Sequence, residues 1–239
     1  MRHVTLRRIL QAISVLLFPL LINWFSPYLV VVGAWSGFIT GSALVFISML
    51  LFSPWLGRLW CGWLCPAGAI MDGCMTMQRR PITRRGISQI KWFIWTPWLV
   101  AILAGYAAHP LSLHFWPTFP GESLSHFHYL VVILKFIIIA LLFALPALFW
   151  GRRAGCHAYC WMAPFLILGT KLGKQMGIAQ LSPHRLSEEC ISCDACANVC
   201  PMSLDVSELI KTGSMEHPEC VSCARCVEAC KIGVLTFKR

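Results

Sequence analysis

Long apolar stretches fill the first two thirds of the chain and give way to short apolar runs among polar residues near its end. A bilayer core of roughly 30 Å takes about 20 predominantly apolar helical residues. Four stretches come close to that length, namely Ile9–Phe25, Leu29–Leu56, Lys91–Ala108 and Tyr129–Trp150. None of them carries the polar stripe with a 3.6-residue period that a core helix of a soluble protein needs. The pattern therefore predicts four transmembrane helices in an all-α membrane part.

Composition supports this interpretation and adds a second domain. Of the 239 residues, 57% are hydrophobic and 13% are charged, against roughly 45–50% and about 25% in soluble domains. A water-soluble globule and a disordered chain are both disfavoured. Acidic residues and cysteines concentrate in the last fifty positions. We therefore expect a transmembrane domain over residues 1–175 and a small metal-binding domain over residues 176–239.

Lysine and arginine are placed unevenly between the predicted spans. They occur in the N-terminal tail, in the loop after the second span and after the fourth span, whereas the connections near Ser26 and over 109–128 carry none. Short cytoplasmic loops carry such a positive excess. We expect a multi-pass protein of a bacterial inner membrane with both termini in the cytoplasm. The net charge of +10 then reflects topology and contact with the lipid bilayer, which gives nucleic-acid binding little support.

The N-terminal arginines also fit a secretory signal. Arg2, Arg7 and Arg8 precede the first apolar run, as in the charged region of such a signal. Bulky residues at 23–25 occupy the place where a cleavage site would be sought. We therefore expect an uncleaved first helix.

Two features inside the predicted spans have more than one interpretation. Lys135 lies a few residues inside the fourth span, where it either extends to the headgroup region or serves a function. Gly33, Gly37 and Gly41 follow one another at a spacing of four. On one helix they would form a smooth stripe, which favours close packing inside the bundle over the alternative of a dimer face.

A Cys-x3-Cys motif follows the second and the fourth predicted span. The first is Gly57-Arg58-Leu-Trp-Cys61-Gly-Trp-Leu-Cys65-Pro66 and the second is Gly151-Arg152-Arg153-Ala-Gly-Cys156-His-Ala-Tyr-Cys160. This internal repeat predicts two parallel two-helix halves, so that both motifs lie at the cytoplasmic face. Residues i and i+4 share one face of a helix, and two facing pairs would form a four-thiolate redox or metal site. The alternative is that these are buried packing residues, as we expect for the isolated Cys74.

The eight cysteines near the C-terminus carry the strongest signal. They are Cys190, Cys193, Cys196 and Cys200, followed by Cys220, Cys223, Cys226 and Cys230. Each run has the x2-x2-x3 spacing of bacterial two-cluster ferredoxins, in which the fourth cysteine ligates the other cluster. The spacing therefore predicts one [4Fe–4S] cluster on Cys190, Cys193, Cys196 and Cys230, and a second on Cys220, Cys223, Cys226 and Cys200.

Zinc is the alternative metal, because paired Cys-x2-Cys also forms tetrahedral zinc sites. The threefold spacing, which occurs twice, favours clusters. Lys231 stands after Cys230 where the first run has Pro201. A positive charge there favours the reduced cluster, so we expect the two clusters to differ in potential.

The first motif with Pro66, the second pair and the two ferredoxin runs together resemble the NapH-type and MauN-type membrane ferredoxins, which are related to the core of the NosR- and CcoG-type proteins. The resemblance covers nearly the whole chain. It implies four spanning helices, two Cys-x3-Cys-Pro motifs and a small α+β two-cluster ferredoxin domain in the cytoplasm. The second motif departs from the pattern, because Trp161 replaces the proline. The chain lacks the large extra domains of the NosR and CcoG types, so the compact type is closest.

The family implies a quinol dehydrogenase-type subunit that passes electrons between the quinone pool and a periplasmic redox enzyme, or a factor that matures a periplasmic metalloenzyme. Our leading hypothesis is electron transfer. The alternatives are an assembly factor that reduces or delivers a metal through Cys61, Cys65, Cys156 and Cys160, and a redox-responsive docking protein. Apart from metal centres, the sequence shows no nucleophile–base pair or nucleotide-binding glycine loop.

The outer connection has an unusual composition. Four histidines and one acid lie among aromatic residues there, and we consider them, with Lys135, for a quinol site: His109, His114, Glu122, His126 and His128. Imidazole titrates near neutral pH and can carry quinol protons. A loop that simply suits the headgroup region is the alternative that we favour, and a b-haem between His109 and His126 or His128 is a further one.

Overall fold

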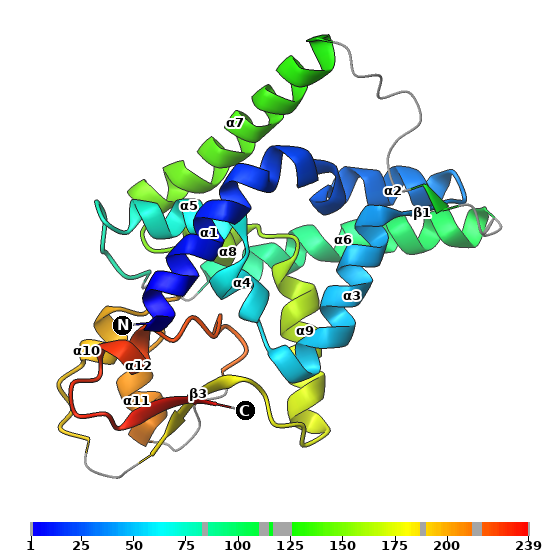
Figure 1. The fold of residues 1–239 in the computed structure, drawn as a ribbon. Helices are drawn as coiled ribbons and strands as arrows, with labels where there is room; N and C mark the ends of the chain where they lie inside the picture. Colours follow the sequence, from blue (N-terminus) through cyan, green and yellow to red (C-terminus); the bar gives the residue numbers. More distant parts are fainter. Residues whose placement is uncertain are drawn as a thin grey trace.

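The structure is a computed structural model that describes residues 2–82, 86–109, 115–116, 126–186, 190–211 and 217–238. It is mostly helical, with two small two-stranded sheets (Figure 1). The elements of the N-terminal part are α1 (Arg2–Leu21), the 3-10 helix η1 (Ile22–Phe25), α2 (Pro27–Trp35), β1 (Ile39–Thr40), α3 (Gly41–Leu56), α4 (Leu59–Trp63), α5 (Pro66–Cys74), α6 (Ile87–Ala108), β2 (Phe115–Trp116), α7 (His126–Phe149), α8 (Ala154–Ala158) and α9 (Ala163–Gln175). Those of the C-terminal part are β3 (Ser182–Arg185), α10 (Ala195–Asn198), α11 (Val206–Lys211), α12 (Arg225–Ala229) and β4 (Leu235–Lys238).

Within the described residues, three helical stretches are long and apolar enough to cross a membrane. They are Val4–Trp35, Ile87–Ala108 and Leu130–Phe149, and Gly41–Leu56 is a shorter apolar helix. Large apolar side chains on these helices face outward, among them Leu20 and Phe93, each 77% exposed. Outward-facing apolar side chains of this density suit contact with lipid. Three long helices and one short helix therefore take the place of the four predicted spans.

The predicted second span is wrong, because Leu29–Leu56 is broken into α2 and α3. Gly37 has φ +73°, a left-handed conformation that ends a helix and favours glycine. The Phe38 amide then donates to the Gly33 carbonyl over 2.9 Å. Thr40 starts α3 by accepting a hydrogen bond from the Ala43 amide over 3.3 Å, as an N-cap residue does.

The break also overturns the predicted glycine stripe. Gly33 lies in α2, Gly37 lies in the turn and Gly41 is the first residue of α3, so the three glycines share no helix face. The fixed turn is held from outside by Tyr106 of α6, whose hydroxyl donates to the Phe38 carbonyl over 3.1 Å. Small residues in this segment therefore serve a tight turn instead of a smooth helix surface.

Each Cys-x3-Cys motif consists of a short helix followed by a longer one. In the first, Cys61 lies in α4 and Cys65 caps α5; in the second, Cys156 lies in α8 and Cys160 precedes α9. The helix that follows each motif packs against the long helix that precedes the other motif: α5 packs against α7, and α9 packs against α3. Helices α1 and α6 complete the surroundings, with α1 on α5 and α6 on α8 (Figure 1). This packing brings the two motifs together.

The C-terminal part combines short helices with one antiparallel strand pair. Strands β3 and β4 pair from Ser182↔Lys238 to Arg185↔Leu235, so the beginning and the end of this part lie side by side. The helices α10, α11 and α12 lie between them in the sequence, and α10 contacts both α11 and α12. The cysteine runs are therefore enclosed within one small α+β unit next to the start of α1 (Figure 1).

Candidate metal centres

The eight C-terminal cysteines line two separate cavities. Cys190, Cys193, Cys196 and Cys230 line one cavity, and Cys200, Cys220, Cys223 and Cys226 line the other. The last cysteine of each run thus faces the cavity that the first three of the other run line. The fold therefore brings each of the two predicted ligand sets together.

The two runs repeat one backbone conformation. Ser192 and Asp194 have φ of 52° and 54°, and the equivalent Ser222 and Ala224 have φ of 49° and 58°. These left-handed residues alternate with the cysteines and turn each run tightly. The third cysteine then lies in the first turn of α10 or α12. Tight turns of this kind allow three thiols of one short segment to face one cavity.

The rest of each cavity is mostly apolar. Cys196, Cys200 and Cys226 are buried, whereas Cys193 of the first set is exposed. Val206 and Leu209 line the cavity of the second set, and Ile210 and Leu235 line that of the first. Burial raises the pKa of Cys220 to about 12. A metal ion deprotonates such a thiol outright. The chemistry of four thiols in an apolar cavity fits an iron–sulfur cluster, which takes cysteine thiolates as ligands.

The four cysteines of the Cys-x3-Cys motifs form a third group, which is fully buried. Cys61, Cys65, Cys156 and Cys160 have exposures of 4%, 7%, 3% and 8%. Burial raises the pKa of Cys65 to about 12. A hydrogen bond from Cys156 lowers the pKa of Cys160 and raises that of Cys156. In the described part of the chain, no three His, Cys, Asp or Glu side chains have the arrangement that a single metal ion takes.

Two arginines place positive charge beside these thiols. Arg58 and Arg153 are both 0% exposed, and Arg153 donates to the Cys61 carbonyl over 2.8 Å. Burial raises the pKa of the Cys61 thiol above its ordinary value, and the charge of Arg58 opposes this effect without cancelling it. Several residues next to the motif cysteines in the sequence have buried nitrogen atoms without a hydrogen-bond partner among the described residues, namely Arg58 Nε and Nη2, Trp60 Nε1 and His157 Nε2. Burial lowers the pKa of His157 to about 4. Cations and unpartnered nitrogens of this kind fit an anionic thiolate centre.

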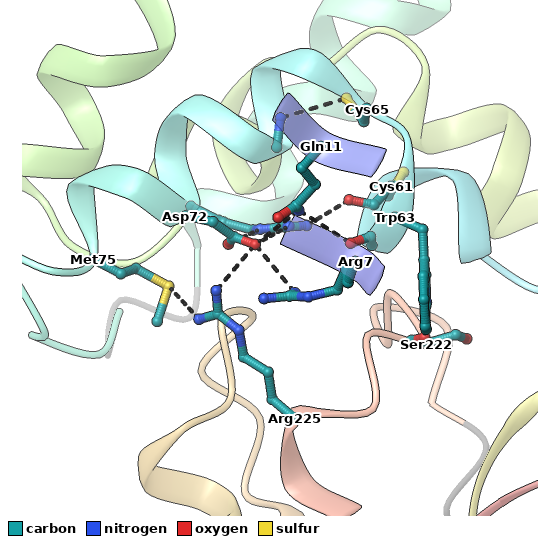
Figure 2. A network of polar contacts seen from close by, with 12 residues as sticks. Arg7, Gln11, Cys61, Trp63, Cys65, Asp72, Met75, Ser222 and Arg225 are labelled. Carbon is teal, nitrogen blue, oxygen red and sulfur yellow. Dashed lines mark hydrogen bonds and ion pairs between the residues drawn. The ribbon is translucent and has the colours of Figure 1, made fainter. Parts of the chain in front are cut away.

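Asp72 of α5 ties the N-terminal part to the second cysteine run. Its carboxylate accepts hydrogen bonds from Arg153 over 2.8 and 2.9 Å and from Gln11 over 3.1 Å. It also pairs with Arg7 and with Arg225, each over 3.2 Å. Figure 2 shows Arg7, Gln11 and Arg225 pointing toward Asp72 from three directions. Burial raises the pKa of Asp72, but the charge and hydrogen bonds of Arg153 outweigh it and hold the pKa at about 2.

Glu219 makes the reciprocal connection from the C-terminal part. Its carboxylate pairs with Arg58 over 2.7 Å and with Lys91 of α6, and accepts from Ser88 over 2.9 Å. Burial raises the pKa of Glu219, yet the charges of Arg58 and Lys91 lower it below its usual range. Since Glu219 immediately precedes Cys220, the pairs hold the second cysteine run against the N-terminal part.

Direct contact between the two parts occurs at the first motif. A Cβ atom on Gly62 would lie 2.2 Å from the Val221 carbonyl oxygen and 3.3 Å from the Cβ atom of Cys223. Next to it, Trp63 Nε1 donates to the Ser222 carbonyl over 2.9 Å (Figure 2). The cavity of Cys200, Cys220, Cys223 and Cys226 is therefore the one that adjoins the four buried thiols.

The residues considered for a quinol site are only partly described. His109 ends α6, and its ring lies 6.1 Å from that of Trp35. Lys135 is exposed on α7. His126 and His128 belong to α7, but their side chains lie outside the described residues, as do His114 and Glu122. The isolated Cys74 is partly buried and packs against the core.

Comparison with known protein families identifies two regions. Residues 170–237 match a family described as "4Fe-4S dicluster domain", and residues 35–81 match one described as "4Fe-4S binding domain". The first region contains both cysteine runs and the second contains Cys61 and Cys65. Both matches support ferredoxin-type iron–sulfur binding by these two regions.

Two curated proteins are similar to the chain over much of its length. One is "Uncharacterized protein MJ0750" of Methanocaldococcus jannaschii, which is 24% identical over 64% of this chain and 62% of its own. The other is "Putative electron transport protein YccM" of Escherichia coli K12, which is 26% identical over 79% of this chain and 54% of its own. The chain thus spans less than two thirds of either relative. No solved structure matches it significantly.

Proposed function

We propose that this chain is a membrane-anchored electron-transfer protein with two [4Fe–4S] clusters in its C-terminal part. One cluster would be held by Cys190, Cys193, Cys196 and Cys230, and the other by Cys220, Cys223, Cys226 and Cys200. The observation that carries the proposal is the pair of cavities, each lined by one of these sets of four thiols. The match of residues 170–237 to a dicluster family supports it.

Bound clusters would supply one-electron redox chemistry at potentials set by their thiolates, hydrogen bonds and burial. The chain's own residues would exclude water and fix the order of the centres. The apolar lining and the burial of Cys200 and Cys226 limit the access of water to the second cluster, and Asp72 and Glu219 anchor the second run. Because Gly62 touches that run, electrons would pass between the second cluster and the buried thiols, with the first cluster farther away.

The four buried thiols would form a third redox-active metal centre. Two fully buried arginines lie beside them, and the residues around Cys61 and Cys65 match an iron–sulfur family. The exposure of Lys231 means that solvent screens its effect on the first cluster. We retain the expectation that the two C-terminal clusters have unequal potentials.

The partner centres would be the quinone pool and a redox enzyme on the outer side of a bacterial inner membrane. The long apolar helices support membrane anchoring, and the name of the YccM relative supports electron transport. The finer assignment to the compact NapH- and MauN-type proteins rests on the motif order. It gives a quinol dehydrogenase-type role.

Metal delivery is the second candidate function. The thiols of Cys156 and Cys160 are hydrogen-bonded to each other, which raises the pKa of Cys156 and lowers that of Cys160. Such thiols can exchange a soft metal ion. All four thiols are shielded, however, with exposures of at most 8%. A thiol that passes a metal to a partner protein must be reached by that partner. The burial therefore favours electron transfer.

A reduction experiment separates the two functions. Anaerobically purified protein in nanodiscs is mixed with a short-chain quinol, and reduction of the C-terminal clusters is followed by EPR. We compare the wild type with a variant in which Cys61, Cys65, Cys156 and Cys160 are serine. A Cys74→Ser variant is the control, since Cys74 is partly buried and its thiol donates to the Ala144 carbonyl.

We expect reduction in the wild type and the control, and at least a tenfold slower reduction in the fourfold variant. Dithionite should still reduce the clusters of the fourfold variant, which shows that they are intact. Unchanged quinol-driven reduction in that variant would contradict a redox role of the buried thiols. If a partner enzyme then also lacked its metal, metal delivery would replace electron transfer.

A further inference from the structure

A wide cleft lies between α1 and the iron–sulfur part, beside the point where the start of α1 contacts it. It has a volume of about 1040 Å³, at the upper end of small-molecule sites. Helices α1 and α5 form one wall, and the ends of α10 and α12 form the other. None of the eight C-terminal cysteines or the four buried thiols lines it. The cleft is therefore separate from the metal centres.

The cleft is apolar at one end and cationic at the other. Ala12, Val15 and Leu16 of α1 and Ala69 and Ile70 of α5 form the apolar wall. These residues of α1 belong to a stretch that is apolar enough to cross a membrane. The cationic end is lined by five arginines, namely Arg7, Arg8, Arg79, Arg152 and Arg225. A ligand that fills the cleft must be amphiphilic.

The arginines outnumber the acids that could neutralise them. Asp72 and Glu228 are the two carboxylates among the lining residues, so five cations minus two anions leave a formal charge of +3. Asp72 also pairs with Arg153, which lies outside the cleft. The Glu228 carboxylate accepts a hydrogen bond from the Val4 amide over 2.7 Å. Much of the arginine charge is left for a ligand.

Two of the arginines are buried and held in place by the protein. Arg7 is 1% exposed, and its Nε atom has no hydrogen-bond partner. Arg152 is 6% exposed and donates to carbonyl oxygens, over 2.8 Å to Arg79 and over 3.2 Å to Cys200. Carbonyl oxygens fix the side chain but do not neutralise it. Arg7 shares the single carboxylate of Asp72 with Arg153 and Arg225. Buried guanidinium charge that is only partly matched is costly, and a bound phosphate would relieve that cost.

We propose that this cleft binds an anionic phospholipid. The phosphate would lie among the arginines, whose guanidinium groups match its geometry, and an acyl chain would follow the apolar wall of α1. Basic pockets beside membrane helices at the cytoplasmic side bind anionic headgroups. A quinone ring is neutral and would leave the arginines unmatched. The lipid would contact both α1 and α12 and so stabilise the contact between the N-terminal part and the iron–sulfur part.

The inference rests on the membrane anchoring proposed above, but not on electron transfer. Native mass spectrometry of the delipidated protein measures binding of phosphatidylglycerol, with phosphatidylcholine as the neutral comparison. The test variant is Arg8→Gln with Arg79→Gln, two exposed cleft residues. The control is Arg80→Gln with Lys174→Gln, which removes the same charge from exposed residues that do not line the cleft.

We expect the wild type and the control to retain phosphatidylglycerol, and the test variant to bind it at least tenfold more weakly. Equal loss in both variants would overturn the proposal, since it would mean general attraction to charge. Stabilisation of the protein by inorganic phosphate alone, at the same concentration as the lipid, would also overturn it in favour of a free anion. Quinol-driven reduction is measured on the same samples; its failure with lipid binding intact would count against electron transfer alone.

Discussion

Gly62 sets the approach of the second cysteine run to the first Cys-x3-Cys motif. The nearest atom to an added Cβ would be the Val221 carbonyl oxygen at 2.2 Å. It is a backbone atom, so no side-chain rotation can relieve the clash. Gly62→Ala should therefore push the run away from the motif, at a cost of about 1–3 kcal/mol in unfolding free energy. It should also change the EPR spectrum of the second cluster.

A matched control lies in α5. Gly73 has nothing within 4 Å of an added Cβ, and alanine is the better helix former. We expect Gly73→Ala to leave the EPR spectrum unchanged and to keep or slightly raise the melting temperature. A Gly62→Ala variant with wild-type melting and spectrum would show that the two parts do not touch there.

Asp72 is the shared carboxylate partner of three arginines that lie far apart in the sequence. Asp72→Asn would leave Arg7, Arg153 and Arg225 without their shared anion, and removal of one partner from a buried pair costs about 3–5 kcal/mol. We expect a large fall in the chemical-denaturation midpoint. Asp205→Asn is the control, because Asp205 is exposed and makes local bonds to Ser207 and Glu208. An equal effect of both substitutions would contradict the role of Asp72.

The same residue predicts a pH dependence. The pKa of Asp72 is about 2 in the folded protein, below its ordinary value of 3.8. Its contribution to stability is therefore fully present above pH 4 and is lost as the pH falls through about 4 toward 2. The melting temperature of the wild type should fall more steeply in this range than that of Asp72→Asn. Acid attacks clusters in both proteins, so the difference between them is the readout; parallel curves would contradict the low pKa.

At the residue scale, the cysteines were predictable and their anchors were not. Cysteine spacing is a local signal, and the two predicted sets each line one cavity. The partners of Asp72 come from α1, the second motif and the second cysteine run, so no local pattern connects them. The one available signal was a lone acid in an apolar segment of the first motif. No comparable signal marked Glu219, because acidic residues are common in that part of the chain.

At the scale of elements, the break between α2 and α3 distinguishes the structure from the predicted span. No polar run marks it, and glycines at a spacing of four fit a helix as well as a turn. What decides is the conformation of Gly37, whose φ is +73°, together with the cap at Thr40. Hydrophobic pattern gives the extent of an apolar stretch but not a break inside it.

Substitution of this glycine tests the break. Gly37→Ala should cost about 1–2 kcal/mol, since a residue with a Cβ atom is strained in the left-handed region. Gly86→Ala is the control, because Gly86 has φ −80° and open space around it. Thermal unfolding in one detergent compares the two. A stabilised Gly37→Ala variant would indicate a continuous helix over this segment.

The packing of the helices that follow the two motifs is a second feature that pattern could not give. The two motifs were recognisable as a pair in the sequence, and a shared four-thiolate site was one of the interpretations that the pair allowed. The packing of α5 on α7 and of α9 on α3 depends on how the apolar helix surfaces fit together. The long helices are apolar all round, so their sequence does not mark which face meets which partner. The predicted repeat of two-helix halves stays a prediction.

At the scale of the whole molecule, the charge distribution makes a prediction about topology. Lysine and arginine lie around the two motifs and are absent from the connection over 109–128. A reporter that is active only in the cytoplasm should work when fused after Arg239, and one that is active only outside should work when fused after His109. The opposite pattern would place the iron–sulfur part outside the cell and contradict the predicted topology.

Iron and acid-labile sulfide, counted in anaerobically purified protein, test the central claim most directly. The measurement uses the variant with Cys61, Cys65, Cys156 and Cys160 replaced by serine, so that the C-terminal cysteines alone are assayed. Two [4Fe–4S] clusters predict about eight iron and about eight sulfide per chain. Zinc in place of iron, or iron without sulfide, would contradict the account.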